Sequence, residues 1–591
     1  MPSRHHVVAA LLQRISFAAA YAPDGAHKAG TTGMDMSEHG AFGNNTTTHN
    51  SQQNMASYAG VSEHSTIILM HIVLMVLAWI FLLPIGVMFS IARSGLALPV
   101  QFCFCVIHAL GLLFGTIYNV KTPDLYRNNA HHTIGWVASW IISVQVLTNL
   151  LSVVQKRREK SRNASGGVER QPFLPSSMAN RSRQGMSSYA NHHASTETEP
   201  GSSSIRSTRS SEDLEKPSPQ DNYDSQSEAS SSYRPSFPRS SSLLTSFPVR
   251  LRSKLPAWLS RALSVFDAIV TRTILPLGFV GLVSGGVVYT GIFRGKHIFN
   301  GLAHFIKGGI FFWYGLLTLG RWMGCFAEYG WAWNIAPTST VPSAEFVESF
   351  VLFLYGSTNV FLEHLAAWGK AWTAQDLEHV SISVLFLGGG LCGMLVESKV
   401  IRNRLNTIIG SMPTNSSSNS NCHTGRAQIQ DQYLEQQLRT PPEVYNFSIN
   451  PIPALIIFLL GIMMSSHHQS SQTSTAVHKQ WGTLLAGSSI MRMLTYTILY
   501  ISPPTSVYPS RPPTELISSF CLIAGGTVFM ASTKDIVHWM ESENLMAMFV
   551  FTVTGGFTAF IMAYEIFVLS LKGWATQREL ERSLKSRSSG S

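Results

Sequence analysis

The amino-acid sequence predicts an all-α membrane protein, a polytopic bundle of about eleven transmembrane helices interrupted by a disordered cytosolic insert. Only 13% of the 591 residues are charged and 45% are hydrophobic, whereas a soluble protein carries charge on about a quarter of its residues. The charges gather between apolar runs of roughly 20 residues, each long enough to cross a hydrocarbon core of about 30 Å as a helix. The lipid bilayer is therefore the first partner that the sequence indicates.

The formal net charge of +10 does not indicate a nucleic-acid partner. The densest basic clusters, Lys156 to Arg162 and Arg578 to Arg587, directly follow apolar runs, where basic residues mark the cytosolic ends of membrane helices. The six cysteines show neither a disulfide framework nor a zinc-binding spacing. The sequence also lacks the nucleophile and phosphate-loop motifs of hydrolases and kinases, so an enzymatic activity stays an open question.

The first part of the chain combines a polar tail, residues 1–62, with a three-helix unit, residues 63–155. Asn44 and Asn45 lie in overlapping glycosylation sequons, which act only in a lumenal segment. A basic run follows the third span, so the positive-inside rule places that end in the cytosol and the N-terminus in the lumen or outside the cell. The two signals favour a secretory-pathway, vacuolar or plasma membrane over a mitochondrial one. The predicted spans are 66–91, 98–118 and 133–154.

Residues 156–262 form the predicted cytosolic insert. From Ser161 to Ser246 the chain is dense in Ser, Pro, Asn and Arg and has too little apolar surface to offset chain entropy, which predicts disorder. The segment from Val249 to Leu263 adds basic residues and Trp258, a composition typical of a helix that lies on the membrane surface.

Residues 263–575 form the predicted second bundle, and residues 576–591 a cytosolic tail. A second disordered loop is predicted from Met412 to Thr440, on the cytosolic side. Counting the spans places the C-terminus in the cytosol, in agreement with its basic residues. The eight predicted spans are 274–293, 298–319, 344–368, 380–396, 451–466, 482–501, 516–531 and 546–571.

The histidines that flank the membrane fall on one side of it in this topology. All of them lie near lumenal helix ends: His71, His131, His132, His297, His304, His364, His379, His467, His468 and His478. Several have carboxylates or methionines beside them, and imidazole, carboxylate and thioether groups are ligands of haem iron, copper and zinc. The alternative is that polar residues collect at helix ends because the bilayer excludes them, and it applies to each histidine taken singly. The predicted metal ligands are His304, His364, His379, His467, His468 and His478.

The first bundle carries a more specific histidine pattern. His71 opens the first span, and His131-His-Thr-Ile-Gly135 opens the third, on the same side of the bilayer. This arrangement resembles the cytochrome b561 membrane core over about 90 residues, and the resemblance implies that His71 and His131 bind one haem b. His108 in the middle span is the further ligand that the resemblance implies. The family's fourth helix begins with a histidine pair that this chain lacks near Arg272, so one haem is expected.

The second bundle resembles the C-terminal domain of fungal Ytp-type membrane proteins across almost all of residues 300–575. Five stretches carry the resemblance: Ala303-His-Phe-Ile-Lys-Gly-Gly309, Gly330-Trp-Ala-Trp-Asn334, Asp376-Leu-Glu-His-Val-Ser-Ile382, Met464-Ser-Ser-His-His-Gln469 and Pro509-Ser-Arg-Pro-Pro-Thr-Glu515. The resemblance implies similarity to electron-transport proteins.

Three charged residues fall inside the apolar spans of the second bundle: Lys307, Glu348 and Arg492. An unpaired charge costs at least about 3 kcal/mol at the bilayer centre, so each needs a partner or water. Depth along the helices predicts that Lys307 pairs with Glu363 and Arg492 with Glu348. Such pairs are structural or line a proton or ion path.

Three functions remain open from the sequence. The first is a haem b protein for transmembrane electron transfer or metal reduction. The second is a transporter or metal-handling protein without haem, with a transition metal ion as its substrate. The third is a non-catalytic membrane scaffold. Neither the substrate nor the oligomeric state can be deduced from the residues.

Overall fold

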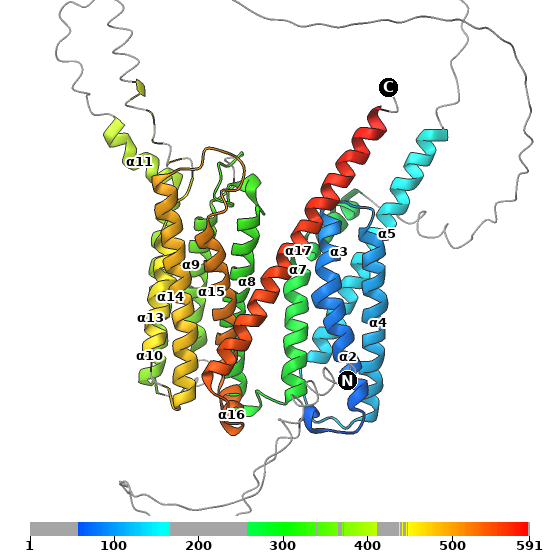
Figure 1. The fold of residues 1–591 in the computed structure, drawn as a ribbon, viewed down its shortest axis with the longest axis vertical. Coiled ribbons are helices and arrows are strands. Elements are labelled where there is room, and N and C mark those ends of the chain that lie inside the picture. The colour runs from blue at the N-terminus through cyan, green and yellow to red at the C-terminus, as the bar shows by residue number, and fades with distance from the viewer. Residues whose placement is uncertain are drawn as a thin grey trace, which may run out of the picture. The chain divides into compact units, whose positions relative to one another are not determined.

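The computed structural model describes residues 57–165, 257–337, 341–363, 371–410, 447–467 and 469–588, with a few single positions between these ranges. The described residues are mainly helical and contain no β-strand (Figure 1). Nine of the described helices are long and apolar enough to cross a membrane. By backbone contacts the described residues before position 150 and after position 260 form one unit.

The predicted all-α membrane fold is confirmed. The nine helices cover nine of the eleven predicted spans, and the other two spans correspond to α9 (Ala344–Glu363) and α13 (Ile452–Ser466). α9 carries Glu345 and Glu348 in its first turns, and α13 has 15 residues, which make about 22 Å of helix. These two helices are therefore the weaker candidates for a span.

The first predicted span is one rod with a π-helical turn in its middle. Its parts are α2 (Ser65–Val76), η2 (Leu77–Leu82) and α3 (Leu83–Ile91). The Leu83 N–H donates to the carbonyl of Ala78, five residues earlier. The turn directly precedes Pro84, whose nitrogen has no hydrogen to donate, and such a turn shifts the helix face by one residue.

Three further helices pack with this rod, and Trp79 from the π-helical turn lies at their centre. They are α4 (Ala97–Lys121), α5 (His131–Ser165) and α7 (Ala257–Thr290). The Trp79 ring meets the Phe104 ring edge to face, with 5.7 Å between centroids. A Cβ at Gly278 of α7 would lie 2.4 Å from the indole, so only glycine allows this approach. The surrounding core is Ala78, Leu83, Val87, Phe104, Ala138, Ile142, Val270 and Ile274.

Two helices run further than the sequence predicted. α5 continues to Ser165, past the predicted span end at Val154 and into the stretch predicted to be disordered from Ser161. α7 begins at Ala257, so the last residues of the predicted surface helix belong to the span itself. Lys, Arg and Glu are good helix formers, which lets a helix continue beyond the apolar segment. The rest of the predicted insert, residues 166–256, and nearly all of the predicted loop 412–440 lie outside the described residues.

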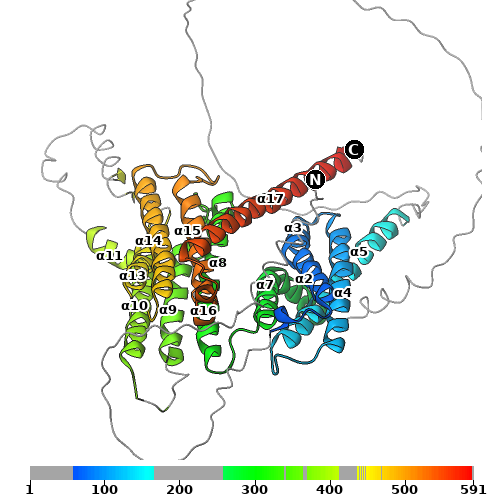
Figure 2. The same cartoon turned by 60° about the horizontal axis from the view of Figure 1, so that its bottom comes forward.

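The C-terminal helices α8, α9, α10, α13, α14 and α15 pack side by side with alternating direction (Figures 1 and 2). We call the end where α8 begins the histidine end, since His304, His379 and His478 lie there, and the opposite end the arginine end, since Arg321 and Arg492 lie toward it. The remaining bounds are α8 (Ile298–Met323), α10 (Ala374–Glu397), α11 (Lys399–Gly410), α14 (Gln472–Ile501), α15 (Pro513–Ala531), α16 (Lys534–Ser542) and α17 (Ala547–Ser588).

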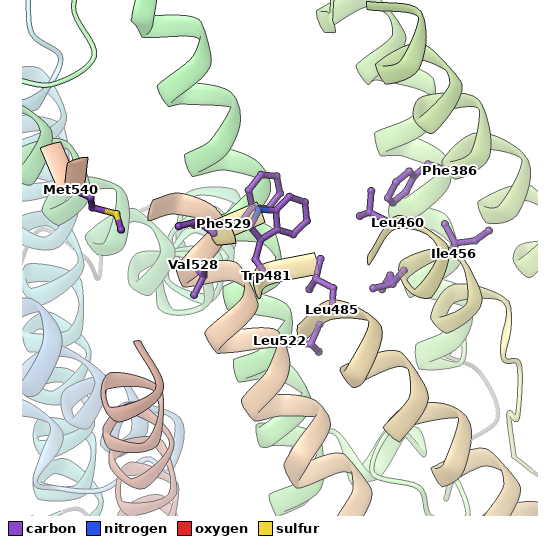
Figure 3. Close-up of a cluster of buried hydrophobic side chains, with 11 residues drawn as sticks. Phe386, Ile456, Leu460, Trp481, Leu485, Leu522, Val528, Phe529 and Met540 are labelled. Atoms are coloured by element: carbon purple, nitrogen blue, oxygen red, sulfur yellow. The ribbon is translucent and has the colours of Figure 1, made fainter. Parts of the chain in front are cut away.

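Aromatic and aliphatic side chains fill the centre of these helices. Trp481 of α14 stacks on Phe529 of α15, with the ring centroids 4.1 Å apart (Figure 3). Leu485 and Leu522 extend the same layer and are almost fully buried. The core therefore joins α14 to α15 as one packed pair.

α17 contacts both the N-terminal and the C-terminal helices. Its Tyr564 hydroxyl donates to the Phe81 carbonyl at 2.6 Å, and the helix also packs on α15 and α8. At the histidine end a second connection forms, because Asp535 of α16 accepts from the Phe293 N–H at 2.7 Å and pairs with His297. The N-terminal and C-terminal helices are therefore joined both through α17 and at the histidine end.

α9 and α10 approach so closely that backbone touches backbone. An ideal Cβ at Gly390 would lie 2.3 Å from the Phe353 nitrogen, and one at Gly356 would lie 2.3 Å from the Leu387 nitrogen. Small residues at a helix interface are the usual means of close packing in lipid, where van der Waals contact drives helix association. The glycines of α10 are therefore not equivalent, since a Cβ at Gly388 would meet nothing within 4 Å.

We predict that Gly390→Ala destabilises the protein by about 1–3 kcal/mol, because the added methyl group forces α9 and α10 apart. Thermal unfolding of the purified protein in nanodiscs measures the effect. Gly388→Ala, on the same helix, is the matched control and should leave the unfolding midpoint unchanged or slightly raised. Equal midpoints for the two variants would contradict the close approach.

Candidate functional site

His71 of α2 is held against α4. Its Nδ1 forms a hydrogen bond with the Gly111 carbonyl at 2.8 Å. A Cβ at Gly115 would lie 2.6 Å from the same ring, so the imidazole occupies space that only glycine leaves. This arrangement fixes the ring plane and engages Nδ1, so Nε2 is the ring nitrogen that could bind a metal ion.

His131, the first residue of α5, is held against α7 in the same manner. Its Nδ1 forms a hydrogen bond with the Ser284 hydroxyl at 3.1 Å. A Cβ at Gly285 would lie 2.9 Å from the ring. Two imidazoles from two helices thus share one pattern, an engaged Nδ1 and a glycine against the edge of the ring.

His108 of α4 differs from these two histidines because both of its ring nitrogens have partners. The Trp79 indole N–H donates to Nδ1 at 3.2 Å, which makes Nδ1 the acceptor. Nε2 therefore carries the hydrogen and donates to the Ser139 hydroxyl at 2.9 Å, which in turn donates to the Gly135 carbonyl. The chain of hydrogen bonds joins the first span, α4 and α5.

The predicted metal ligands that the structure describes lie at the histidine end, but not around one point. The rings of His304 of α8 and His478 of α14 meet edge to face with centroids 6.2 Å apart, and each Nδ1 is bonded to a carbonyl of its own helix. His467 lies 3.7 Å from Glu378 of α10, next to His379. No group of three His, Cys, Asp or Glu side chains suited to a metal ion occurs among the described residues. His364 and His468 lie outside them.

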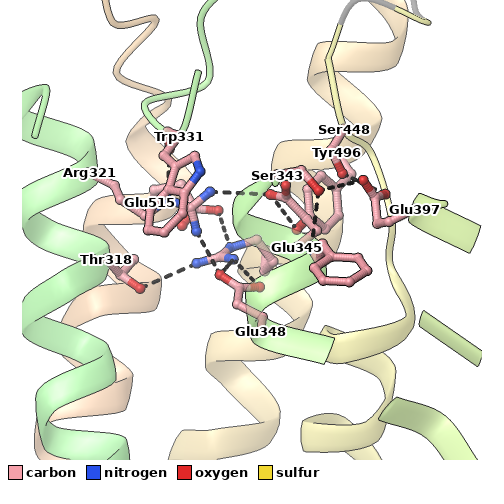
Figure 4. A network of polar contacts seen from close by, with 12 residues as sticks. Thr318, Arg321, Trp331, Ser343, Glu345, Glu348, Glu397, Ser448, Tyr496 and Glu515 are labelled. Atoms are coloured by element: carbon pink, nitrogen blue, oxygen red, sulfur yellow. Dashed lines mark hydrogen bonds and ion pairs between the residues drawn. The ribbon is translucent and has the colours of Figure 1, made fainter. Parts of the chain in front are cut away.

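The arginine end holds a buried network of ion pairs between the C-terminal helices (Figure 4). Arg321, near the end of α8, donates through Nη1 to Glu348 at 2.7 Å and through Nη2 to Glu345 at 3.2 Å. Arg492 of α14 donates to Glu348 at 3.3 Å, and its Nε lies 2.7 Å from Glu515 of α15. We call these five side chains the arginine cluster. Each is at least about nine-tenths buried.

Hydroxyl and carbonyl groups complete the shell of the arginine cluster. Thr318 accepts from Arg492 at 3.3 Å, and the Tyr314 hydroxyl accepts from the same guanidinium at 3.3 Å. The Tyr496 hydroxyl donates to Glu345 at 3.3 Å. The Trp331 carbonyl accepts from Arg321 Nε at 2.7 Å. The hydrogen-bond acceptors around the two guanidiniums are therefore all oxygen atoms of carboxyl, hydroxyl or carbonyl groups.

The loop between α8 and α9 covers the arginine cluster with an aromatic ring. The Arg321 guanidinium lies 4.4 Å from the centroid of Trp333, and that of Arg492 lies 5.6 Å from the same ring. Trp333 is 4% exposed, so this ring shields both cations from solvent. Cation–π contact stabilises a desolvated cation by about 2 kcal/mol or more.

A second loop, residues 502–512 between α14 and α15, fixes the first. The buried Asn334 side chain donates to the carbonyls of Ala327 and Val507, and the Ile335 N–H donates to Ser506. The Trp322 indole N–H donates to the Pro512 carbonyl at 3.1 Å. Two of the stretches that carry the Ytp-type resemblance, 330–334 and 509–515, thus meet at the cap of the cluster.

Sequence reasoning found part of this cluster. The predicted Arg492–Glu348 pair is confirmed. Arg321, Glu345 and Glu515 were missed, because each lies within a few residues of a helix end, where a charge is ordinary. One signal could have indicated them. The end of α8 carries a positive charge, and the beginnings of α9 and α15, on the same side of the bundle, carry negative charges. The predicted Lys307–Glu363 pair remains a prediction, since the Glu363 side chain is outside the described residues.

The fold and its apolar helices define the class: an α-helical, multi-pass integral membrane protein. Residues 277–573 match the family model "Protein YTP1-like, C-terminal", and residues 51–155 match "Domain of unknown function (DUF2427)". The chain belongs to the YTP1-like family of membrane proteins.

Relatives of the chain occur in two yeasts. It is 34% identical over 539 residues to an uncharacterized membrane protein of Schizosaccharomyces pombe, covering 86% of this chain and 94% of that protein. An uncharacterized membrane protein of Saccharomyces cerevisiae is 42% identical over 339 residues, 54% of this chain and 50% of that protein. Protein YTP1 of the same yeast is 23% identical over 259 residues, 44% of each chain. No solved structure matches the chain.

We predict that Arg321→Ala lowers the free energy of unfolding by about 3–5 kcal/mol, because it leaves Glu345 buried without its cation. Denaturation of the purified protein followed by intrinsic fluorescence measures the loss. The control is Arg582→Ala, which removes an Arg–Glu pair whose arginine side chain is 53% exposed, and should cost less than about 1 kcal/mol. If both variants lose the same stability, the cluster does not stabilise the bundle.

Proposed function

We propose that the N-terminal helices hold one haem b between His71 and His131 and that the protein carries electrons within the membrane. The observation that carries the proposal is the shared setting of the two imidazoles. Each has its Nδ1 engaged and its ring edge against a glycine, Gly115 or Gly285. A carbonyl or hydroxyl partner on Nδ1 orients the ring of a metal-binding histidine.

The chemistry of the residues present fits a haem, because two imidazoles offer nitrogen ligands of the kind that haem iron takes and the neighbouring core is aliphatic and aromatic. Glycines on α4 and α7 let the two rings seat against those helices. A haem b supplies one-electron redox chemistry, and the protein tunes its potential through axial ligands, hydrogen bonds and burial. His108 has both ring nitrogens in structural hydrogen bonds, so its role in the proposal is to position the helices.

Two helices supply the ligands and the others exclude water. His71 lies two turns into the first span, while His131 opens α5, and α4 runs antiparallel between them in sequence. Both ligands would therefore lie toward the same face of the membrane. His304 and His478 of the C-terminal helices lie at the corresponding helix ends, toward the same face of the membrane.

We predict that the purified full-length protein has the reduced-minus-oxidised absorption spectrum of a b-type cytochrome. His71→Ala or His131→Ala should abolish the low-spin signal or convert it to a high-spin one, because each removes one of two axial ligands. His132→Ala is the matched control, since His132 is the exposed neighbour bonded to Trp136, and its spectrum should equal that of the wild type. A wild-type protein without haem after expression with haem precursor rules out the proposal.

His108→Ala separates a ligand from a positioning residue. It should lower the unfolding midpoint, because the buried Trp79 N–H loses its acceptor at a cost of about 1–3 kcal/mol, while the low-spin spectrum of the folded protein remains.

The same proposal includes an orientation, with the N-terminus lumenal or extracellular and the C-terminus cytosolic, in a secretory-pathway, vacuolar or plasma membrane. The sequons at Asn44 and Asn45 and the basic run after the third span support it. We predict that endoglycosidase treatment raises the gel mobility of the wild type and not of an Asn44→Gln, Asn45→Gln double variant. A wild-type protein that is unaffected by the enzyme argues for the opposite orientation or for a membrane outside the secretory pathway.

A further inference from the structure

A carboxyl group lies within the apolar part of α17, one of the helices long and apolar enough to cross a membrane. Glu565 is about 27 Å along this helix from Ala547, and the next charged residue, Lys572, follows about 10 Å further on. The six residues between Glu565 and Lys572 carry no charge. Because the hydrocarbon core is about 30 Å thick, Glu565 lies inside it, toward the arginine end.

The Glu565 side chain lies against the end of α8, which α17 passes (Figures 1 and 2). Its Oε1 is 3.6 Å from the point that a Cβ at Gly320 would take, and Cys325 Sγ is 3.8 Å from the same point. The rest of this interface is apolar, since Leu319 of α8 and Met562 of α17 belong to one buried hydrophobic cluster. The carboxyl group is therefore placed among apolar side chains and the backbone of α8.

Glu565 has no cation and no hydrogen-bond donor beside it in the described part of the chain. Its Oε2 is buried and unpartnered, and no ion pair or hydrogen bond reaches the carboxyl group from any described residue. The neighbouring Tyr564 hydroxyl donates to the Phe81 carbonyl instead. Lys572, two turns away on the same helix, forms no ion pair with Glu565. An ionised Glu565 would therefore be an isolated charge.

The other helices that pack on α17 do not supply a partner either. α3 has no charged or titratable residue. Arg321, Arg492 and Glu515 pair within the arginine cluster. The charged and titratable groups on these elements toward the arginine end are Tyr314 and Arg321 of α8, Cys325 and Glu328 of the connection after it, Arg492, Tyr496 and Tyr500 of α14, and Glu515 and Cys521 of α15.

This setting separates Glu565 from the carboxyl groups of the arginine cluster, each of which lies within 3.2 Å of a guanidinium nitrogen. An unpaired charge in hydrocarbon costs about 3 kcal/mol, and a buried carboxyl group without a partner avoids that cost by binding a proton. The Glu565 side chain is also partly exposed, and the next two residues, Ile566 and Phe567, are exposed apolar side chains. In a membrane, this surface of α17 faces lipid.

We propose that Glu565 is a proton-binding site open to the lipid, with its carboxyl group protonated at neutral pH. Release of the proton to water would leave a negative charge between the apolar faces of α17 and α8. The bound proton therefore stabilises the contact between these two helices. The site does not depend on the haem proposal, because none of its groups belongs to the N-terminal helices.

Infrared spectroscopy of the full-length protein in nanodiscs tests the protonation, because the C=O stretch of a protonated carboxyl group differs from the bands of a carboxylate. We expect the wild type at neutral pH to show such a band, and the Glu565→Gln variant to lack it. The difference between the two spectra is read, so that other carboxyl groups cancel. The band should weaken as the pH is raised, because the proton is then lost. Identical spectra of the two proteins overturn the proposal.

Thermal unfolding shows whether the variant keeps the fold. Glu565→Gln should move the unfolding midpoint by less than about 1 °C, because the amide resembles the protonated acid. Glu348→Gln is the matched comparison and should lower the midpoint by about 3 °C or more, because it removes the carboxylate that two guanidiniums share. A Glu565→Gln protein that is as unstable as Glu348→Gln would show that Glu565 is ionised and paired.

A lipid-soluble carbodiimide, N,N′-dicyclohexylcarbodiimide, tests the access from lipid. A protonated carboxyl group gives its proton to a carbodiimide nitrogen and bonds through oxygen to the central carbon, and rearrangement gives a stable N-acylurea without a leaving group. Mass spectrometry of peptides should find this adduct on Glu565. It should persist in Glu581→Gln, which changes an exposed glutamate of the same helix, whereas a water-soluble carbodiimide should leave Glu565 unmodified. Modification by the water-soluble reagent, or none by the lipid-soluble one, contradicts a protonated group open to lipid.

Discussion

The structure of the C-terminal helices depends on the fact that hydrocarbon cannot solvate a guanidinium. Arg321 and Arg492 are almost fully buried, and each brings five N–H donors that need acceptors. Glu348 lies between the two cations and contacts both. Because these partners come from four helices, the requirement to satisfy two arginines fixes the relative position of α8, α9, α14 and α15 at one end.

The cap over the cluster follows from the same requirement. A cation that has left water still needs its open faces covered, and the Trp333 ring covers both guanidiniums. The ring can stay there because Asn334 and the Pro-rich loop hold the turn that carries it. The stretches that identify the family are thus the ones that close a charged site against water. Their role can be stated in physical terms without knowing the activity.

The spans could be predicted from the sequence because a run of about 20 apolar residues has few alternatives to a membrane helix. The ends of α5 and α7 could not, since Lys, Arg and Glu are good helix formers and let a helix continue past its apolar segment. The π-helical turn before Pro84 was equally invisible, yet it sets where Trp79 points. The positions of Arg492 and Glu348 along their predicted spans were enough to pair them. The Arg321–Glu348 pair depends on which helices are neighbours, and no local sequence pattern specifies that.

The histidines also show what helix neighbours decide. The sequence predicted that the histidines lie at one set of helix ends, but it did not predict which histidines contact each other. His71 and His131 share a setting, His108 is a tether, and His304 meets His478 without a third ligand among the described residues. The type of residue predicted a chemistry, and the neighbours on adjacent helices decide whether each nitrogen is available for it.

α17 is the helix through which the two halves of the protein can influence each other. Its Tyr564 hydroxyl holds the carbonyl of Phe81, one residue before the π-helical turn ends, and the next residue, Glu565, lies beside Gly320 of α8. Gly320 directly precedes Arg321, so a single turn of α17 touches both the rod that carries His71 and the helix that carries Arg321. Packed helices transmit shifts because their interfaces are close-packed and have few alternative arrangements.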